Sequence, residues 1–222
     1  AVLCTLPLAA LVGSNNLSTA IILLGICAFL IFISHPGYLP FLWMGGAGAG
    51  FIAVFLVMES YRLERLAIWH NPEAYEKGFQ TIQGLYAIGS GRIFGCGFGR
   101  GLQKLGFVPE AQNDMIFSVI CEENGLFGAC LIIAVFAVLI WRLMVISIHA
   151  KDLCGALIVG GIMGHIALQV ILNIAVVTNT IPNTGITLPF ISYGGTSVLF
   201  LLGEMGLALS VSRDTDNSNP GK

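Results

Sequence analysis

The sequence predicts an all-α polytopic membrane protein with five complete transmembrane helices, the end of a sixth, and one large loop that contains short amphipathic helices. Three observations lead to this fold class. The chain of 222 residues is 56% hydrophobic and only 10% charged. Its mean hydropathy of +0.87 lies far above the range of soluble domains. Long apolar runs without charge recur along the chain. These features exclude a soluble single-domain enzyme.

The apolar runs define the expected helices in chain order. A helix needs about 20 apolar residues to cross the roughly 30 Å hydrocarbon core of a bilayer. We interpret the first stretch, Ala1–Val12, as the end of a helix that begins before this sequence. The complete runs are Leu17–Ser34, Leu39–Met58, Met115–Met144, Leu153–Val177 and Leu188–Val211. We expect residues 1–222 to form a single membrane domain.

One long polar loop, residues 59–114, interrupts the series of short connections. It is rich in glycine and carries six of the ten basic residues, so chemistry is expected there. Within it, helical spacing relates the apolar residues Phe79, Ile82, Leu85 and Tyr86, which is typical of a short amphipathic helix at a membrane interface. We expect this stripe to be buried by packing or by the interface, since apolar stripes usually mark buried faces.

Charge and cysteine content exclude further classes of protein. The formal net charge of −2 provides no basic surface for nucleic acid. The six cysteines form no CxxC pair and no cluster with histidine, so neither a disulfide framework nor a zinc site is expected. Charge also leaves open the orientation of the chain in the membrane. The basic residues of the large loop favour a cytoplasmic position for it, but loops of about 60 residues translocate largely regardless of charge.

Alternating glycines occupy residues 95–101 of the loop. Their spacing matches neither of the glycine-rich nucleotide-binding motifs, so we interpret them as backbone that closely approaches a ligand or another segment. The neighbouring cations Arg92, Arg100 and Lys104 are candidates for binding an anionic group. Solvent or lipid headgroups are an equally good alternative for these three side chains.

A cluster of polar residues leads from the loop into the third apolar run and includes Glu110 and Asp114. If this segment were helical, Glu110 and Ser118 would lie one turn on either side of Asp114, on one face. The alternative is that both acids occupy a helix N-terminus, where the positive end of the helix dipole stabilises them. The residues alone leave both interpretations open.

Several polar side chains fall inside apolar runs. Carboxylates are costly near hydrocarbon, so Glu122, Glu123 and Glu204, together with His165, imply either a cavity or a hydrogen bond to a neighbouring helix. Helix-breaking residues and hydroxyl groups also occur at the start of the last apolar run. Irregular backbone is tolerated there only if it is buried in protein or lines a water-filled cavity. The candidate cavity-lining residues are Ser118, Glu122, Ser192 and Tyr193.

Three segments resemble the signature sequences of the SEDS (shape, elongation, division and sporulation) family. They are GFQTIQGLYAIGSG at 78–91, PEAQNDMIFSVICEENG at 109–125 and NTGITLPFISYGGTS at 183–197. Ala111 after Pro109-Glu110 is most similar to the FtsW and SpoVE branch of that family. The resemblance implies a bacterial peptidoglycan glycosyltransferase with ten transmembrane helices, of which this chain would contain the end of the fifth through the tenth.

The resemblance also implies a reaction and its residues. The family polymerises lipid II with inversion, and its catalytic aspartate lies in a PExxxD segment, which places the general base at Asp114. The cations Arg62, Arg92, Arg100 and Lys104 are then candidate contacts for pyrophosphate or sugar, and Glu110 is a further candidate substrate-binding residue. A divalent cation, Mg²⁺ or Mn²⁺, is a candidate cofactor, and no organic cofactor is expected.

The implied setting is the bacterial cytoplasmic membrane, with the large loop outside. The implied partners are a class B penicillin-binding transpeptidase and other membrane proteins of division or sporulation. Two alternative functions remain. One is a lipid II transporter, in which Glu122, His165 and Glu204 would line a path through the membrane. The other is a scaffold without catalytic activity, for which Asp114 would be dispensable.

Overall fold

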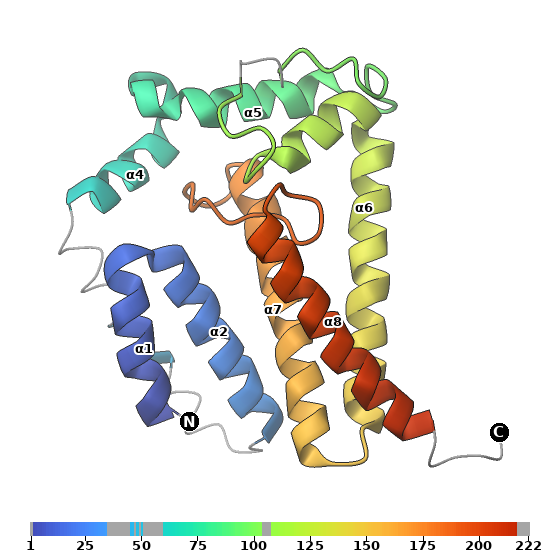
Figure 1. Cartoon of the computed structure of the whole chain (residues 1–222). Helices are drawn as coiled ribbons and strands as arrows, with labels where there is room; N and C mark the ends of the chain where they lie inside the picture. Colours follow the sequence, from blue (N-terminus) through green and yellow to red (C-terminus); the bar gives the residue numbers. More distant parts are fainter. Residues whose placement is uncertain are drawn as a thin grey trace. The chain divides into compact units, whose positions relative to one another are not determined.

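The computed structural model describes residues 2–34, 45, 46, 48, 50, 60–103 and 108–216. In these residues the secondary structure is entirely helical (Figure 1), which confirms the all-α fold class. The helices are α1 (Val2–Asn15), α2 (Leu17–Ser34), α4 (Ser60–His70), α5 (Phe79–Ser90), α6 (Ile116–His149), α7 (Leu153–Val177) and α8 (Gly195–Asp216), with single 3₁₀ turns at Pro72–Ala74 and Glu76–Gly78.

Three of the described helices, α6, α7 and α8, are long and apolar enough to cross a membrane. The protein is therefore a multi-pass membrane protein. Helix α2 is also apolar but shorter, at 18 residues. The predicted run Leu39–Met58 lies outside the described residues except for four single positions. The predicted last helix was too long at its start, because residues 188–194 are irregular and α8 begins at Gly195.

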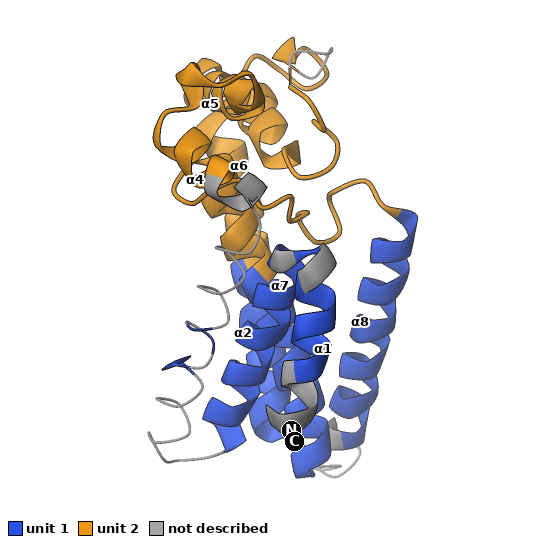
Figure 2. Ribbon diagram, turned by 90° about the vertical axis from the view of Figure 1, so that its left-hand side faces the viewer, with its two compact units in different colours: residues 1–55, 137–168, 195–222 blue, residues 56–136, 169–194 orange. Residues whose placement is uncertain are grey.

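The chain divides into two compact units, which Figure 2 distinguishes by colour. Unit 1 contains Ala1–Phe55, Ala137–Leu168 and Gly195–Lys222, and unit 2 contains Leu56–Phe136 and Gln169–Gly194. In unit 1, α1 and α2 form a helical hairpin. Asn16 makes the turn between them, since its side-chain oxygen accepts a hydrogen bond from the Thr19 amide and so caps α2.

Small residues bring the helices of unit 1 close together. A methyl group at Gly164 would lie 2.9 Å from the Phe29 ring, and one at Gly25 would lie 2.9 Å from Leu168. The GxxxG spacing of Gly160 and Gly164 thus coincides with a close approach of α7 to α2. His165 of α7 and Glu204 of α8 pair with each other at 2.9 Å, as the hydrogen-bonding interpretation of these residues predicted.

Unit 2 contains the large loop. Its helix α5 confirms the predicted amphipathic helix, but the face that packs inward is made of Thr81, Gly84 and Ala87. Gly84 lies so close to Met115 that a methyl group there would come within 2.3 Å of its terminal carbon. The apolar stripe points outward, with Phe79 46% and Tyr86 59% exposed. The stripe is thus only partly buried within the described structure, and its burial at the membrane interface stays a prediction.

Candidate active site

The large loop ends in a turn that carries Asp114, which is 8% exposed. Residues 109–115 form turns rather than a helix, and Glu110 has a positive φ of 51°. Helix α6 begins at Ile116, two residues after Asp114. A continuous helical face through Glu110, Asp114 and Ser118 is therefore wrong, because the positive φ at Glu110 prevents the helix from extending back to it.

The backbone of this turn is held by side chains from elsewhere in unit 2. Asn173 of α7 is fully buried, and its Nδ2 donates to the carbonyl oxygens of Asp114, at 2.8 Å, and of Ile186, at 2.7 Å. The Ser192 hydroxyl donates to the Asn113 carbonyl at 2.7 Å. Buried polar groups are costly unless they are bonded, so these contacts fix the position of Asp114 strongly.

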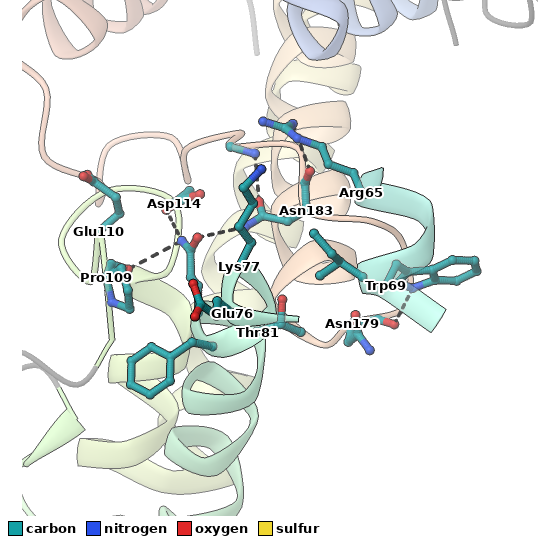
Figure 3. Close-up of a pocket in the computed structure, with 14 residues that line it drawn as sticks. Arg65, Trp69, Glu76, Lys77, Thr81, Pro109, Glu110, Asp114, Asn179 and Asn183 are labelled. Carbon is teal, nitrogen blue, oxygen red and sulfur yellow. Dashed lines mark hydrogen bonds between the residues drawn. The ribbon is translucent and has the colours of Figure 1, made fainter. Parts of the chain in front are cut away.

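A chain of hydrogen bonds also reaches the Asp114 carboxyl group. Gln80 of α5 donates from Nε2 to Asp114 Oδ1 at 3.3 Å, and Asn183 Nδ2 donates to Gln80 Oε1 at 3.1 Å. Arg65 of α4 donates to the Asn183 carbonyl at 3.2 Å. Figure 3 shows Arg65, Asn183 and Asp114 around this chain. The carboxyl group is thus oriented from α5 and from the segment after α7.

Asp114 lines a cavity of about 460 Å³ in unit 2, a volume typical of ligand sites. Two cations, Arg65 and Lys77, line it together with three acids, Glu76, Glu110 and Asp114 (Figure 3). Lys77 pairs with Glu64 at 2.9 Å, but its side chain is 70% exposed, so the pair is weak and Lys77 can exchange it for another anion. The remaining lining residues are Ile68, Trp69, Phe79, Gln80, Thr81, Pro109, Asn179, Asn183 and Gly185.

Burial raises the pKa of Asp114 above its ordinary value of 3.8, and the negative charge of Glu110 raises it further. Hydrogen bonds from the backbone and from Gln80 act in the opposite direction and favour the ionised form. A carboxylate with a raised pKa is a stronger proton acceptor than an exposed one. The site therefore contains a positioned base beside a cavity of ligand size.

The predicted substrate-binding residues separate in the structure. Glu110 lines the cavity with Asp114. Arg92 and Arg100 are exposed and do not line it. Lys104 lies outside the described residues, as does the side chain of Arg62.

The four candidate cavity-lining residues do not line this cavity. Ser118 is fully buried and donates to the Met115 carbonyl. Ser192 accepts a hydrogen bond from the Leu188 amide at 2.7 Å while it holds the turn before Asp114. Tyr193 is 77% exposed, and its backbone amide donates a hydrogen bond to the Gln112 carbonyl in the turn. Glu122 lies in α6 and has a different role, because it binds backbone amides of the glycine-rich loop.

The glycine-rich loop packs against a break in α6, as close approach to another segment predicted. Gly125 interrupts the helix with φ 66° and ψ −164°. The loop amides of Cys96 and Gly97 donate to the carbonyl oxygens of Glu122 and Glu123, each at 3.0 Å. On the other side of the break, the amides of residues 126 and 127 donate to loop carbonyl oxygens at 2.9 and 3.0 Å. The loop therefore satisfies the backbone groups that the break exposes.

Two buried carboxylates complete this junction. Glu122 Oε1 accepts hydrogen bonds from the amides of Leu102, at 2.9 Å, and Gln103, at 3.2 Å. Glu123 Oε2 accepts one from the Gly99 amide at 3.0 Å. These bonds explain why two acids are tolerated at 5% and 6% exposure. The contacts support the hydrogen-bonding alternative for Glu122 and Glu123, but the partner is the glycine-rich loop rather than a neighbouring helix.

Sequence reasoning missed Gln80, Asn173 and Asn183 as site residues. Asn173 lies inside an apolar run, so the argument applied to His165 and Glu204 also selects it. Gln80 and Asn183 fall within two of the three family-like segments, but no spacing rule links them to Asp114. Their proximity comes from the folding of unit 2.

Among the described residues, the structure brings together no group of three His, Cys, Asp or Glu side chains able to hold a metal ion. The cavity still presents carboxylates at Asp114, Glu110 and Glu76. Mg²⁺ is commonly held by one or two carboxylates together with substrate phosphates, so this donor set fits a cation that arrives with a phosphorylated substrate.

Comparison with known proteins supplies the family context. Residues 1–217 match the family of cell cycle proteins that comprises FtsW, RodA and SpoVE. The chain is 43% identical over 201 residues to stage V sporulation protein E of Bacillus subtilis, covering 89% of this chain and 55% of that protein. It is 37% identical over 207 residues to a probable peptidoglycan glycosyltransferase FtsW of Coxiella burnetii, covering 91% and 56%.

Solved structures agree with these relatives. A chain of a peptidoglycan synthase complex, studied for its coordination of polymerization and crosslinking, matches with a TM-score of 0.77 and 27% identity, covering 96% of this chain and 61% of that one. The rod shape determining protein RodA of Thermus thermophilus matches with a TM-score of 0.64 and 26% identity, covering 96% and 55%. The chain thus spans little more than half the length of the relatives it matches.

Proposed function

The chain belongs to the FtsW, RodA and SpoVE family of cell cycle proteins, and from this premise we propose that the full-length protein polymerises lipid II into peptidoglycan glycan strands. The observation that carries the proposal is the buried, positioned carboxylate of Asp114 on the wall of a cavity of about 460 Å³. Relatives named peptidoglycan glycosyltransferase support the reaction class. We propose a role in division or sporulation, which fits the similarity to SpoVE and FtsW.

The proposed step is an inverting displacement. The 4-hydroxyl oxygen of one GlcNAc forms a bond to the anomeric carbon of a second lipid II unit, and the bond from that carbon to the pyrophosphate oxygen breaks. Asp114 accepts the hydroxyl proton, and undecaprenyl pyrophosphate leaves with the bonding electron pair. General base catalysis requires an ionised carboxylate held within hydrogen-bond reach of the hydroxyl, which the contacts of Asp114 favour.

The leaving pyrophosphate needs positive charge. Arg65 and Lys77 are the cations that line the cavity, so we assign this role to them in place of the exposed Arg92 and Arg100. A divalent cation, Mg²⁺ or Mn²⁺, is also part of the proposal: it would supply Lewis-acid stabilisation of the leaving group, with Glu110 and Glu76 as available ligands.

The proposed setting follows from the substrate. We propose that the large loop faces outside the bacterial cytoplasmic membrane, where lipid II is polymerised. The partner that we propose is a class B penicillin-binding transpeptidase, because a similar chain occurs in a complex that coordinates polymerization with crosslinking. Other membrane proteins of division or sporulation are further proposed partners.

A lipid II transporter is the second candidate, and one observation favours it. In unit 1 an apolar cavity of about 640 Å³ lies against α2, α7 and α8 and includes the His165 and Glu204 pair. Fluorescent lipid II in vesicles containing the purified full-length protein separates the two functions. A polymerase yields glycan resolved on a gel. Movement of lipid II across the bilayer without glycan would contradict the proposal and support the transporter.

The hydrogen bond from Gln80 gives a test of the base assignment. In Gln80→Leu the carboxylate loses a charge-stabilising donor, so we expect polymerisation at neutral pH to fall roughly 10-fold. Activity requires ionised Asp114 and falls as the pH drops through its raised pKa. Because Gln80 lowers that pKa, the acid limb of the pH–rate profile should move to higher pH in the variant.

The matched control is Gln83→Leu, on the same helix but not lining the cavity. It should retain both the rate and the pH profile of the wild type. The wild-type protein must first be shown to be active. If the acid limb of the pH–rate profile were then the same in Gln80→Leu as in the wild type, Gln80 would not position the base.

A further inference from the structure

The glycine-rich loop carries an exposed apolar surface that the proposed reaction does not use. Its large side chains Ile93, Phe94, Phe98 and Leu102 are 60%, 79%, 89% and 66% exposed. We call these four residues the loop apex. Apolar side chains rarely gather on a surface in contact with water, so a nonaqueous environment is indicated.

The apex is held in a defined position beside α6. The loop amides and carbonyl oxygens bond to both sides of the helix break at Gly125, and Glu122 and Glu123 bind further loop amides. A methyl group at Gly95 would lie 2.1 Å from the Glu123 carbonyl oxygen, so the two backbones are in direct contact. The apex therefore stays at the level of residues 122–127 of α6.

This level is the edge of the apolar part of α6. The charged and polar side chains end at Asn124, and no charged residue follows until Arg142. Leu126, Phe127 and Leu131 are 61%, 65% and 55% exposed and begin the exposed apolar surface of this candidate membrane span. The backbone bonds from residues 126 and 127 to Arg92 and Ile93 place the start of the apex directly beside that surface.

We propose that the loop apex inserts into the phospholipid leaflet next to α6, with Arg92 and Arg100 at the level of the headgroup phosphates. Both arginines are exposed: Arg92 directly precedes the apex, and Arg100 lies within it, between Phe98 and Leu102. Cations beside exposed apolar side chains suit anionic lipid at a membrane interface. Insertion also accounts for the buried acids. Water could not reach loop amides that lie within the phospholipid leaflet, so Glu122 and Glu123 supply the hydrogen-bond acceptors that these amides need. This inference does not depend on the proposed reaction.

Tryptophan fluorescence in vesicles tests the insertion. Full-length protein carrying Phe98→Trp, or Phe94→Trp as an independent position, is reconstituted into phosphatidylglycerol vesicles with or without lipids brominated on the acyl chains. The emission of the added tryptophan, taken as the difference from wild type, should be lost in brominated lipid and protected from aqueous iodide. Glu73→Trp, an exposed position on the 3₁₀ turn Pro72–Ala74, is the control and should respond to iodide.

Three results would overturn the proposal. Quenching of both apex tryptophans by iodide alone would place the apex in water. Protection from both quenchers would place it against protein, either another part of the full-length chain or a second copy. Quenching of the apex tryptophans by brominated lipid to no greater extent than in the Glu73→Trp control would show that the apex lies no deeper in the bilayer than an exposed loop position.

Discussion

Replacing Asp114 with asparagine should reduce lipid II polymerisation by the full-length protein about 10²–10⁴-fold, the range that a general base contributes. Asparagine keeps the size of the side chain but cannot accept the proton of the attacking hydroxyl. The backbone bonds to Asn173 and Ser192 do not involve the carboxyl group, so the turn should remain in place. The initial rate of glycan formation measures the effect.

Stability should change in the opposite direction in this variant. The pKa of Asp114 is raised in the folded protein, so the folded state carries a buried charge at neutral pH that the unfolded state holds in water. The neutral amide of Asp114→Asn removes this cost, and thermal stability at neutral pH should be equal to or above that of the wild type. Asp152→Asn, at the start of α7, is the activity control. Polymerisation by Asp114→Asn at the wild-type rate would exclude the base assignment.

Replacing Gly95 with alanine should detach the glycine-rich loop from α6. The new methyl group would lie 2.1 Å from the Glu123 carbonyl oxygen, and the residue has a φ of 76° that favours glycine. Strain of this kind costs about 1–3 kcal/mol before the clash is counted. The bonds that cap the helix break would then be lost or weakened, so we expect a marked fall in the melting temperature of the purified full-length protein.

Two other glycines separate the causes of this effect. Gly99 has a comparable φ of 79° but open space around it, so backbone strain alone should destabilise the Gly99→Ala variant. Gly89→Ala, in α5, has open space and no such strain, and should be neutral or stabilising by up to about 1 kcal/mol. If Gly95→Ala were no less stable than Gly99→Ala, the contact between the loop and α6 would not be important for stability.

Hydropathy predicted the long apolar helices because length and absence of charge are local properties. The predicted run Leu153–Val177 has the same bounds as α7. The predicted run Met115–Met144 begins one residue before α6, which ends at His149. The predicted start of the last helix was wrong because Leu188–Tyr193 is apolar enough for a helix but has an irregular backbone. Phe190 has a φ of 62°, and the Ser192 hydroxyl oxygen accepts a hydrogen bond from the Leu188 amide.

The candidate site was predictable only in part. Asp114 followed from the resemblance, and its position at the start of a membrane helix followed from the apolar run. The residues that orient it did not, since Gln80 and Asn173 lie 34 and 59 positions away along the chain. Such contacts depend on tertiary structure. Likewise, the glycines predicted a close approach, but the partner segment depended on the break at Gly125, which a single glycine signals only weakly.

The most direct test of the central claim is a gel that resolves glycan made from lipid II by the purified full-length protein, with a divalent cation and the partner transpeptidase present. Wild type and Asp152→Asn should give glycan strands, and Asp114→Asn should give none. Equal product from all three would show that Asp114 is dispensable. No product from any of them, with lipid II still crossing vesicle membranes, would contradict the polymerase account and favour the transporter.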